Sequence, residues 1–398
     1  MPIPLLKTGK RGRAFPEIRR RLYFSVSSEG FGHSSRAIAL AQQFEDDEIL
    51  IGAYSYALER VESFGLPCVE IPQEVEFVGD AGSFSIGRTL LHNQSRALSF
   101  NQIVQDEMEV MRNYGISLVI ADGRMAPVLA ASQLDIPCVV VTNQSAFYPF
   151  FARDSALVKL FGRSFEWVMR FWLSSAEEIF IPDFPPPHTV CLPNLARDFQ
   201  VMKRTRFVGP LVAWKAEDVE PLARPHGSGP LVVVGLGGHS YRKPLFEAVL
   251  QMAAQSPHIQ FELLTTFTES QLPPNVRLNA TPKMAVSYFK AADLVITQGG
   301  HSTAMELLTL GRPSLVIPDT NQIEQENNAR RLAELGASRA LSYEQVSAGL
   351  LKPAMDAMLE STSYRQAAEC LAAEAAQIDG ARRAADVLRE YAGRLLAY

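Results

Sequence analysis

Short apolar runs alternate with amphipathic stretches along the chain from residue 22 onward. The run 231–236 is almost continuously apolar, which is typical of a strand buried on both faces of a parallel sheet. Between such runs, apolar residues recur at helical spacing, as they do in 37–44. Strands are expected at 22–27, 48–54, 117–122, 137–143, 178–182, 231–236, 261–267, 294–299 and 314–319. This alternation predicts α/β units throughout.

Proline and glycine gather between residues 209 and 230, with a few charges among them, and this composition is typical of a linker. The chain of 398 residues is long enough for two domains, each with its own core. The predicted parts are a basic and disordered N-terminal tail over 1–20, a first domain over 21–208, the linker over 209–228 and a second domain over 229–398. The second domain ends in an Ala/Arg/Glu-rich helix after Ser363, which could cross back to the first domain.

The composition argues against a nucleic-acid-binding protein and against a membrane-spanning one. A net charge of −5 gives no general attraction to nucleic acid. The four cysteines form no CxxC pair, and Cys68 and Cys138 open apolar runs, so we expect buried, reduced thiols in a cytoplasmic protein. No apolar stretch approaches the roughly 20 residues that span a bilayer. The basic tail lacks the apolar core of a secretory signal, but a targeting segment of the transit type stays open.

Three times, an apolar run ends in a glycine turn followed by Gly-His-Ser and then by a helical pattern. Such a loop suits an anion, because glycine lets the backbone approach a phosphate and the free amides of the next helix point at it. Glycine turns and serine caps also occur without any ligand, but three loops with histidine favour a functional site. The three sets are Gly30, Gly32, His33 and Ser34; Gly237, Gly238, His239 and Ser240; and Gly299, Gly300, His301 and Ser302.

The third loop lies within a segment, 291–337, that resembles the donor-binding part of GT-B glycosyltransferases, especially the UDP-glycosyltransferase type and the bacterial GlcNAc transferase that forms lipid II. The resemblance implies that the Gly-Gly-His-Ser turn holds the diphosphate, with the second loop beside it. Glu306 would accept hydrogen bonds from the ribose hydroxyls. Glu324 and Gln325 would contact the donor sugar, although their spacing from Pro318 is about two residues longer than in the plant and animal enzymes.

The first domain resembles the same superfamily. GFGHSSRAIALA (residues 30–41) is similar to its GxGHxxRxxALA opening, and the segment 117–144 and the phrase RFVGPLV (206–212) match later parts in the right order. The implied fold is α/β, with two Rossmann-like domains facing each other across a cleft. The first domain would bind the acceptor and the second the nucleotide-sugar.

The resemblance also implies a mechanism. His33 would be the general base toward the acceptor hydroxyl and Asp122 would steady it. Transfer would be inverting and need no cofactor or metal, because amides and helix dipoles stabilise the leaving UDP. His33 could instead only position acceptor or phosphate, and Asp122 could be a helix cap. Arg36, in the acceptor-side loop with Gly30 and Gly32, would contact acceptor or phosphate, or be solvated.

Several questions stay open at this stage. The transferred sugar would be a hexosyl or N-acetylhexosaminyl group, and the acceptor a lipid-linked molecule, a glycan or a small molecule. A UDP-sugar hydrolase of the pseudaminic-acid type, a non-hydrolysing 2-epimerase and a non-catalytic nucleotide-sugar-binding protein are the alternatives. Residues 147–172 contain nine aromatics, which suits either an interfacial helix with peripheral membrane contact or an ordinary amphipathic helix packed on the sheet.

Overall fold

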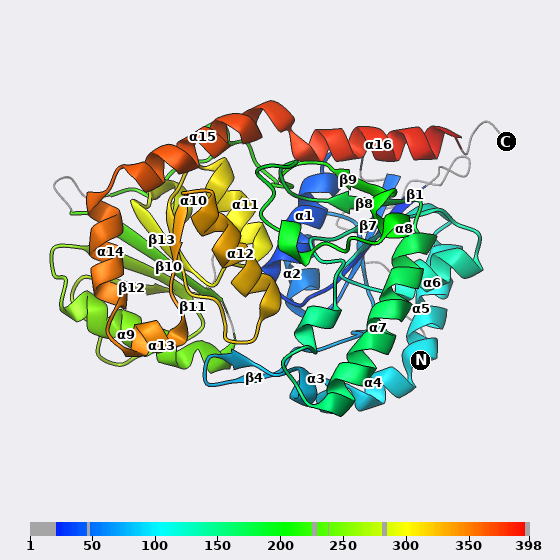
Figure 1. Cartoon of the computed structure of the whole chain (residues 1–398). Coiled ribbons are helices and arrows are strands. Elements are labelled where there is room, and N and C mark those ends of the chain that lie inside the picture. The colour runs from blue at the N-terminus through cyan, green and yellow to red at the C-terminus, as the bar shows by residue number, and fades with distance from the viewer. Residues whose placement is uncertain (1–20, 46–47, 225–228, 238, 281–284, 395–398) are drawn as a thin grey trace.

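The computed structural model describes residues 21–45, 48–224, 229–237, 239–280 and 285–394. These residues form two lobes, each built around a parallel sheet (Figure 1). The tail expected over 1–20 lies outside the described residues, and so does Gly238 of the second glycine loop.

The first sheet has seven parallel strands in the order β3-β2-β1-β6-β7-β8-β9. The chain starts at β1, runs outward to β3 and returns to β6 on the other side of β1. Ligands of open α/β sheets bind beyond the carboxyl ends of strands at such a switch point. The strands are β1 (Arg21–Val26), β2 (Ile49–Ala53), β3 (Cys68–Glu70), β6 (Ile116–Asp122), β7 (Cys138–Val141), β8 (Glu178–Ile181) and β9 (Thr205–Phe207).

Two apolar layers cover this sheet, and consecutive residues of β6 alternate between them. Val119 and Ala121 pack toward α5 and α6, whereas Leu118 and Ile120 pack toward α1. This alternation explains why the strand reads as one continuous apolar run. The helices of this lobe are α1 (Phe31–Ala41), α2 (Ser55–Ser63), α3 (Ile86–His92), α4 (Gln94–Leu98), α5 (Phe100–Asn113), α6 (Ala126–Gln133), α7 (Ala156–Ser175) and α8 (Phe199–Met202).

The second sheet has six parallel strands in the order β12-β11-β10-β13-β14-β15 and the same kind of switch point, between β10 and β13. Its strands are β10 (Leu231–Gly237), β11 (Gln260–Thr265), β12 (Val276–Asn279), β13 (Leu294–Thr297), β14 (Ser314–Val316) and β15 (Ser338–Ala340). Its helices are α9 (Lys243–Ala254), α10 (Val286–Ala291), α11 (His301–Thr309), α12 (Ile323–Glu334), α13 (Tyr343–Ser347), α14 (Leu351–Glu360) and α15 (Ser363–Ile378).

The two lobes are connected in two further places besides the linker. A hairpin of the first lobe, β4 (Gly79–Asp80) and β5 (Ser83–Phe84), bonds to the second lobe through Phe84 N and Thr320 O at 2.8 Å. Past Ile378 the chain returns to the first lobe as α16 (Gly380–Arg394), which lies above that lobe in Figure 1. Ala384 and Leu388 of α16 are buried in the same core as Phe24. The end of the chain therefore crosses back to the first domain, as the sequence analysis allowed.

Candidate active site

A cavity of about 1190 Å³ lies between the lobes, where the carboxyl ends of both sheets face each other. The first and third glycine loops both line it. Gly32 of the first loop lies so close to the third that a Cβ on it would sit 2.4 Å from Ser302 Oγ. The N-terminal ends of α1 and α11 therefore meet across the cleft, and glycine at position 32 permits this approach.

His33 and Asp122, which the family resemblance paired, lie in contact at the cavity wall. His33 Nδ1 is 2.7 Å from Asp122 Oδ1 and 2.9 Å from Arg36 Nη2. An ionised carboxylate only accepts and a guanidinium only donates, so the shorter contact directs the Nδ1 proton toward Asp122. The other ring nitrogen, Nε2, has no partner among the described residues and is free to take a proton. Asp122 caps no helix, since α6 begins after Met125.

Gly123 makes room for the imidazole. Its φ is +68°, and a Cβ there would lie 2.5 Å from Cε1 of His33. Glycine is the residue that adopts this backbone conformation without strain and leaves that space empty. The Asp-Gly pair at the end of β6 is the signal in the sequence that could have pointed to this role.

Arg36 is not solvated, which corrects one of its two sequence-based interpretations, whereas contact with acceptor or phosphate stays a prediction, since the residue lines the cavity. The side chain is buried, its Nε donates to Asp122 Oδ2 at 2.6 Å and its Nη1 donates to Asn143 Oδ1 at 2.9 Å. Burial alone would raise the pKa of Asp122, but the charges of Arg36 and His33 overcome this and hold the pKa below its ordinary value. Arg36 thus keeps Asp122 ionised and fixed.

Asn143, which the sequence analysis left without a role, carries this network to the second lobe. Its Nδ2 donates to Glu324 Oε1 at 2.8 Å. Glu324 Oε1 also lies 3.4 Å from Asn328 Nδ2. A continuous chain of polar contacts therefore joins His33 to Glu324, one of the residues expected to contact the donor sugar.

The start of α11 forms the opposite wall of the cavity. Gly299 has φ +82°, and a Cβ on it would lie 2.9 Å from Val316, while Gly300 borders open space. No side chain caps α11, so Ser302 does not act as a cap. Ala304 is the first residue of this turn whose amide bonds to the helix, to Gly300 O at 3.0 Å. The amides of residues 301–303 have no acceptor among the described residues, as an anion site requires.

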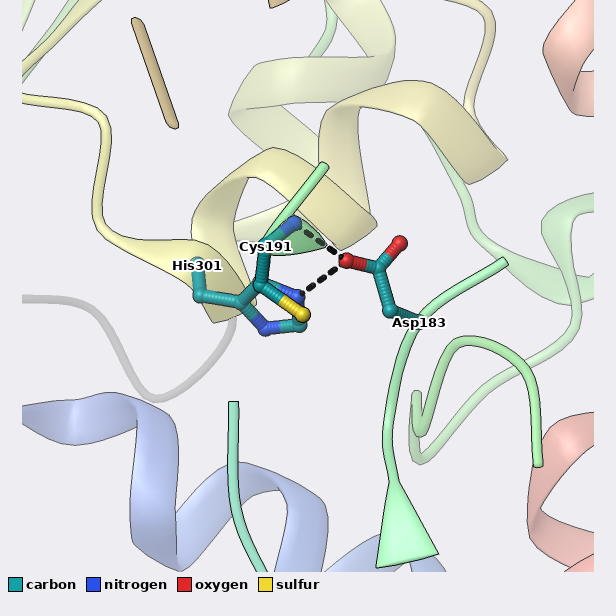
Figure 2. Close-up of side chains that lie close together, drawn as sticks. All are labelled: Asp183, Cys191 and His301. Carbon is teal, nitrogen blue, oxygen red and sulfur yellow. Dashed lines mark hydrogen bonds and ion pairs between the residues drawn. The ribbon is translucent and has the colours of Figure 1, made fainter. Parts of the chain in front are cut away.

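The imidazole of His301 reaches the first lobe. Its Nε2 lies 2.9 Å from Asp183 Oδ2, and the same oxygen accepts from Cys191 N at 2.8 Å (Figure 2). Asp183 follows β8 and is fully buried; burial raises its pKa, but His301 more than offsets this and the pKa is lowered. His301 therefore offers a ligand its backbone amide, while its ring ties the donor loop to the first lobe.

Asp183, Cys191 and His301 are also a set that could hold a metal ion, since their ligand atoms lie within 4.8 Å of one another. Thiolate, imidazole and carboxylate are the ligands that Zn²⁺ prefers. Both oxygens of Asp183 already accept hydrogen bonds, however, with Phe184 N at 2.7 Å from Oδ1. Burial, together with the Asp183 charge, raises the pKa of Cys191 well above its ordinary value, which disfavours the thiolate. The cluster fits an interdomain contact better than a metal site.

Glu306 lines the cavity one helical turn beyond Ser302, as the sequence placed it. Its carboxyl group makes no hydrogen bond to any described residue. Burial raises its pKa to about 7, and Arg60 of α2 opposes the rise only in part. Arg60 Nε is itself buried without a hydrogen-bond partner in the described structure. The carboxyl group is thus available to a ligand's hydroxyls.

The other residues on the donor side of the cavity interact with neighbouring side chains of the protein. Gln325 binds Asp319, with Oε1 accepting from Asp319 N at 2.9 Å and Nε2 lying 3.2 Å from Oδ2. Arg242, which follows the second loop, also binds Asp319, through Nη2 at 2.6 Å. His239 lines the cavity and stacks on Tyr241, and burial lowers its pKa to about 4, so it stays neutral. Asp319 and Arg242 were not singled out by the sequence analysis.

Comparison with known proteins agrees with this arrangement. The model of the glycosyltransferase family 28 C-terminal domain matches residues 237–386, and that of glycosyl transferase family 1 matches residues 20–159. A protein of Methanosarcina mazei named as an uncharacterized glycosyltransferase is 33% identical over 386 residues, covering 94% of this chain and 99% of its own length. The lipid II-type UDP-N-acetylglucosamine transferase of Bacillus cytotoxicus is 25% identical over 321 residues, covering 75% of this chain and 80% of its own.

Solved structures show the same fold. The calicheamicin glycosyltransferase CalG4 superposes with a TM-score of 0.67 at 20% identity, covering 94% of this chain and 99% of that one. The two facing parallel sheets, the glycine loops at their carboxyl ends and the full-length relatives all point to the same conclusion. The chain belongs to the GT-B glycosyltransferases, in the family 28-like group.

Proposed function

We propose that this glycosyltransferase moves a sugar from a nucleotide-sugar, with UDP as the nucleotide, to an acceptor hydroxyl with inversion and without a metal, in the cytoplasm. The observation that carries the proposal is the position of the His33–Asp122 pair and of the unbonded amides of α11 on opposite walls of one cavity. A base on one side and an anion site on the other are what an in-line displacement at a sugar carbon needs.

In the proposed reaction, the acceptor hydroxyl gives its proton to Nε2 of His33. The acceptor oxygen then forms a bond to the anomeric carbon from the face opposite the nucleotide, and the bond from that carbon to the diphosphate oxygen breaks. The diphosphate leaves toward the α11 amides, whose partial positive charge stabilises it. Asp122 keeps the imidazole in the required tautomer and stabilises the imidazolium that forms. Glu306 would hold the ribose hydroxyls.

The nucleotide can be identified by a thermal-shift screen against UDP, dTDP, GDP and CMP. UDP is favoured by the name of the Bacillus relative, whereas a structural neighbour, the spinosyn rhamnosyltransferase SpnG, was solved with thymidine diphosphate. One nucleotide should raise the melting temperature, and Glu306→Ala should abolish the rise. Glu344→Ala, at an exposed position of α13, is the matched control and should keep it. No shift with any nucleotide would contradict the donor site.

Hydrolysis is the second reaction that this geometry permits, because water could occupy the place of the acceptor hydroxyl. The relatives named above are transferases, which favours transfer. Release of the nucleoside diphosphate from its nucleotide-sugar, measured with and without candidate acceptors, separates the two. Transfer predicts a rate that depends on the acceptor, and equal rates in both conditions would show a hydrolase.

A further inference from the structure

Helix α7 carries large apolar side chains on its solvent-facing side. They are spaced so that they share one face of the helix. The exposed fractions are 77% for Leu157, 61% for Leu160, 45% for Phe161, 70% for Trp167 and 58% for Phe171. We call these five residues the α7 stripe. The next helix, α8, which packs beside α7, adds Phe199 and Met202, exposed by 73% and 55%. Contiguous exposed apolar groups of this size mark an interaction site.

The neighbouring face of α7 forms part of the cavity wall, through Phe165, Met169, Trp172 and Leu173. Phe161 belongs to both faces, because it is exposed and also lines the cavity. An apolar surface therefore continues from the outside of the molecule into the space that His33 borders. The inward face agrees with the amphipathic helix packed on the sheet that the sequence allowed, and the exposed face leaves the interfacial interpretation as a prediction.

The charges around the α7 stripe are mostly positive. Lys159, Arg163 and Arg170 lie on α7, and its one acid, Glu166, is buried, where its Oε2 accepts from Phe147 N at 2.6 Å. Arg170 is partly neutralised, by Glu166 at 3.1 Å and by Asp198 at 4.0 Å. Arg163 stays exposed and lies over the Tyr148 ring. Basic side chains beside an exposed apolar stripe are complementary to an anionic lipid surface.

We propose that the α7 stripe docks the protein on an anionic membrane surface and that the cavity takes an acceptor whose apolar part comes from that surface. This inference rests on the proposed function, since it assigns the acceptor of the same site. A membrane accounts for both faces of α7 together. The stripe inserts among the lipids, the basic residues meet the headgroups, and the acceptor's apolar part lies along Phe161, Phe165 and Trp172 with its hydroxyl toward His33. No described helix is long and apolar enough to cross a bilayer, so the contact would be peripheral.

The test is co-sedimentation of the full-length protein with phosphatidylcholine vesicles with and without phosphatidylglycerol. We expect binding that needs the anionic lipid, and a fall of about tenfold or more in the partition coefficient for Trp167→Ser/Phe171→Ser. Leu350→Ser removes an exposed leucine of the second lobe and is the matched control, with unchanged binding expected. Binding to neither vesicle would overturn the proposal, and so would equal binding of the double variant.

A second readout places the contact on α7 itself. The chain has three tryptophans, Trp167, Trp172 and Trp214, of which Trp167 is 70% exposed. Brominated lipids in the vesicles should quench the wild-type fluorescence, and Trp167→Phe should remove most of that quenching. Quenching that stays the same in Trp167→Phe would contradict docking through α7.

Two controls separate this inference from its alternatives. If the stripe instead covers a second copy of the chain, the double variant will turn a dimer into a monomer without changing vesicle binding, and the proposal is then wrong. The nucleotide-induced thermal shift should be the same in wild type and double variant, because the donor wall is untouched. Lost vesicle binding with an intact shift supports docking, whereas a missing shift in both proteins is a failure of the proposed function alone.

Discussion

Around His33 in the first-lobe wall of the cavity, the polar side chains are bonded to one another, whereas in the second-lobe wall several have no partner among the described residues. His33, Asp122, Arg36 and Asn143 form one network. Across the cleft, the amides of residues 301–303 and the carboxyl of Glu306 are unbonded, and Gln298 Nε2 and Gln322 Oε1 are buried without a hydrogen bond.

The difference follows from what each wall does. A general base needs its orientation and tautomer fixed before the substrate arrives, so its neighbours are bonded in advance. A binding wall keeps donors and acceptors free for the ligand, although a buried polar group without a partner costs about 1–3 kcal/mol. We therefore expect substitutions in the first wall to lower kcat and substitutions in the second wall to weaken nucleotide binding.

Asp122→Asn should give the largest difference between an effect on kcat, which depends on the first-lobe wall, and an effect on nucleotide binding, which depends on the second-lobe wall. The amide cannot hold His33 Nδ1–H and Arg36 as the carboxylate does, so kcat should fall by about a thousandfold. The Kd for the nucleotide should stay unchanged. Rates of nucleotide release in the presence of acceptor measure the first quantity, and calorimetric titration the second. Asp106→Asn in α5, away from the cavity, is the control. A fall in nucleotide affinity with unchanged kcat would contradict the assignment.

Asn143→Ala tests whether the network couples the walls. It removes the contacts to Arg36 and to Glu324, and kcat should fall by about tenfold or more, since Asp122 keeps its other bonds. In a double-mutant cycle with Glu324→Gln, the two effects should be less than additive, because the residues share a hydrogen bond. Additive effects would mean that the 2.8 Å contact does not link base and donor site.

Glu306, in the second-lobe wall, should make both the stability of the protein and its nucleotide binding depend on pH. Its folded pKa of about 7 lies above the ordinary value of 4.5. The group's contribution to stability is therefore complete below the ordinary pKa and is lost as the pH rises through 7. Glu306→Gln should raise Tm more at about pH 8 than at about pH 5, and should weaken nucleotide binding by about tenfold at the higher pH. An equal change in Tm at both pH values would contradict the raised pKa.

The smallest expected effect is that of Gln298→Met. Gln298 is 5% exposed and its Nε2 has no partner in the described structure. Replacing the amide by a thioether of similar size should stabilise the free protein slightly and weaken nucleotide binding by about threefold. A more stable variant with unchanged nucleotide affinity would show that this amide is not a ligand contact.

The apolar pattern predicted much of the fold, because strands buried on both faces need continuous apolar runs. Each of the nine expected runs overlaps a strand. None of the nine runs covers β3, β4, β5, β9, β12 or β15, since strands of two to four residues such as Ser338–Ala340 carry polar side chains and no distinct period. Their place at or near sheet edges is set by tertiary pairing, which no local pattern records.

Some features of the candidate site could likewise be predicted from the sequence, and others could not. Glycine loops follow strands by simple local rules, so the contact of His33 with Asp122 could be anticipated through the family resemblance. The burial of Arg36 could not be predicted, because it depends on the segment after β7 bringing Asn143 beside it. The partner of His301 could not be found either, since Asp183 lies 118 residues away and carries no motif. The catalytic role of His33 and the donor contacts stay predictions.

The most direct test of the account is His33→Ala, measured for turnover and for nucleotide affinity in the same preparation. We predict that acceptor-dependent release of the nucleotide falls by about a thousandfold or more. The nucleotide Kd and its thermal shift should match those of the wild type, because the α11 amides and Glu306 are intact. Turnover close to wild type would contradict His33 as the base, and with it the assignment of the two walls.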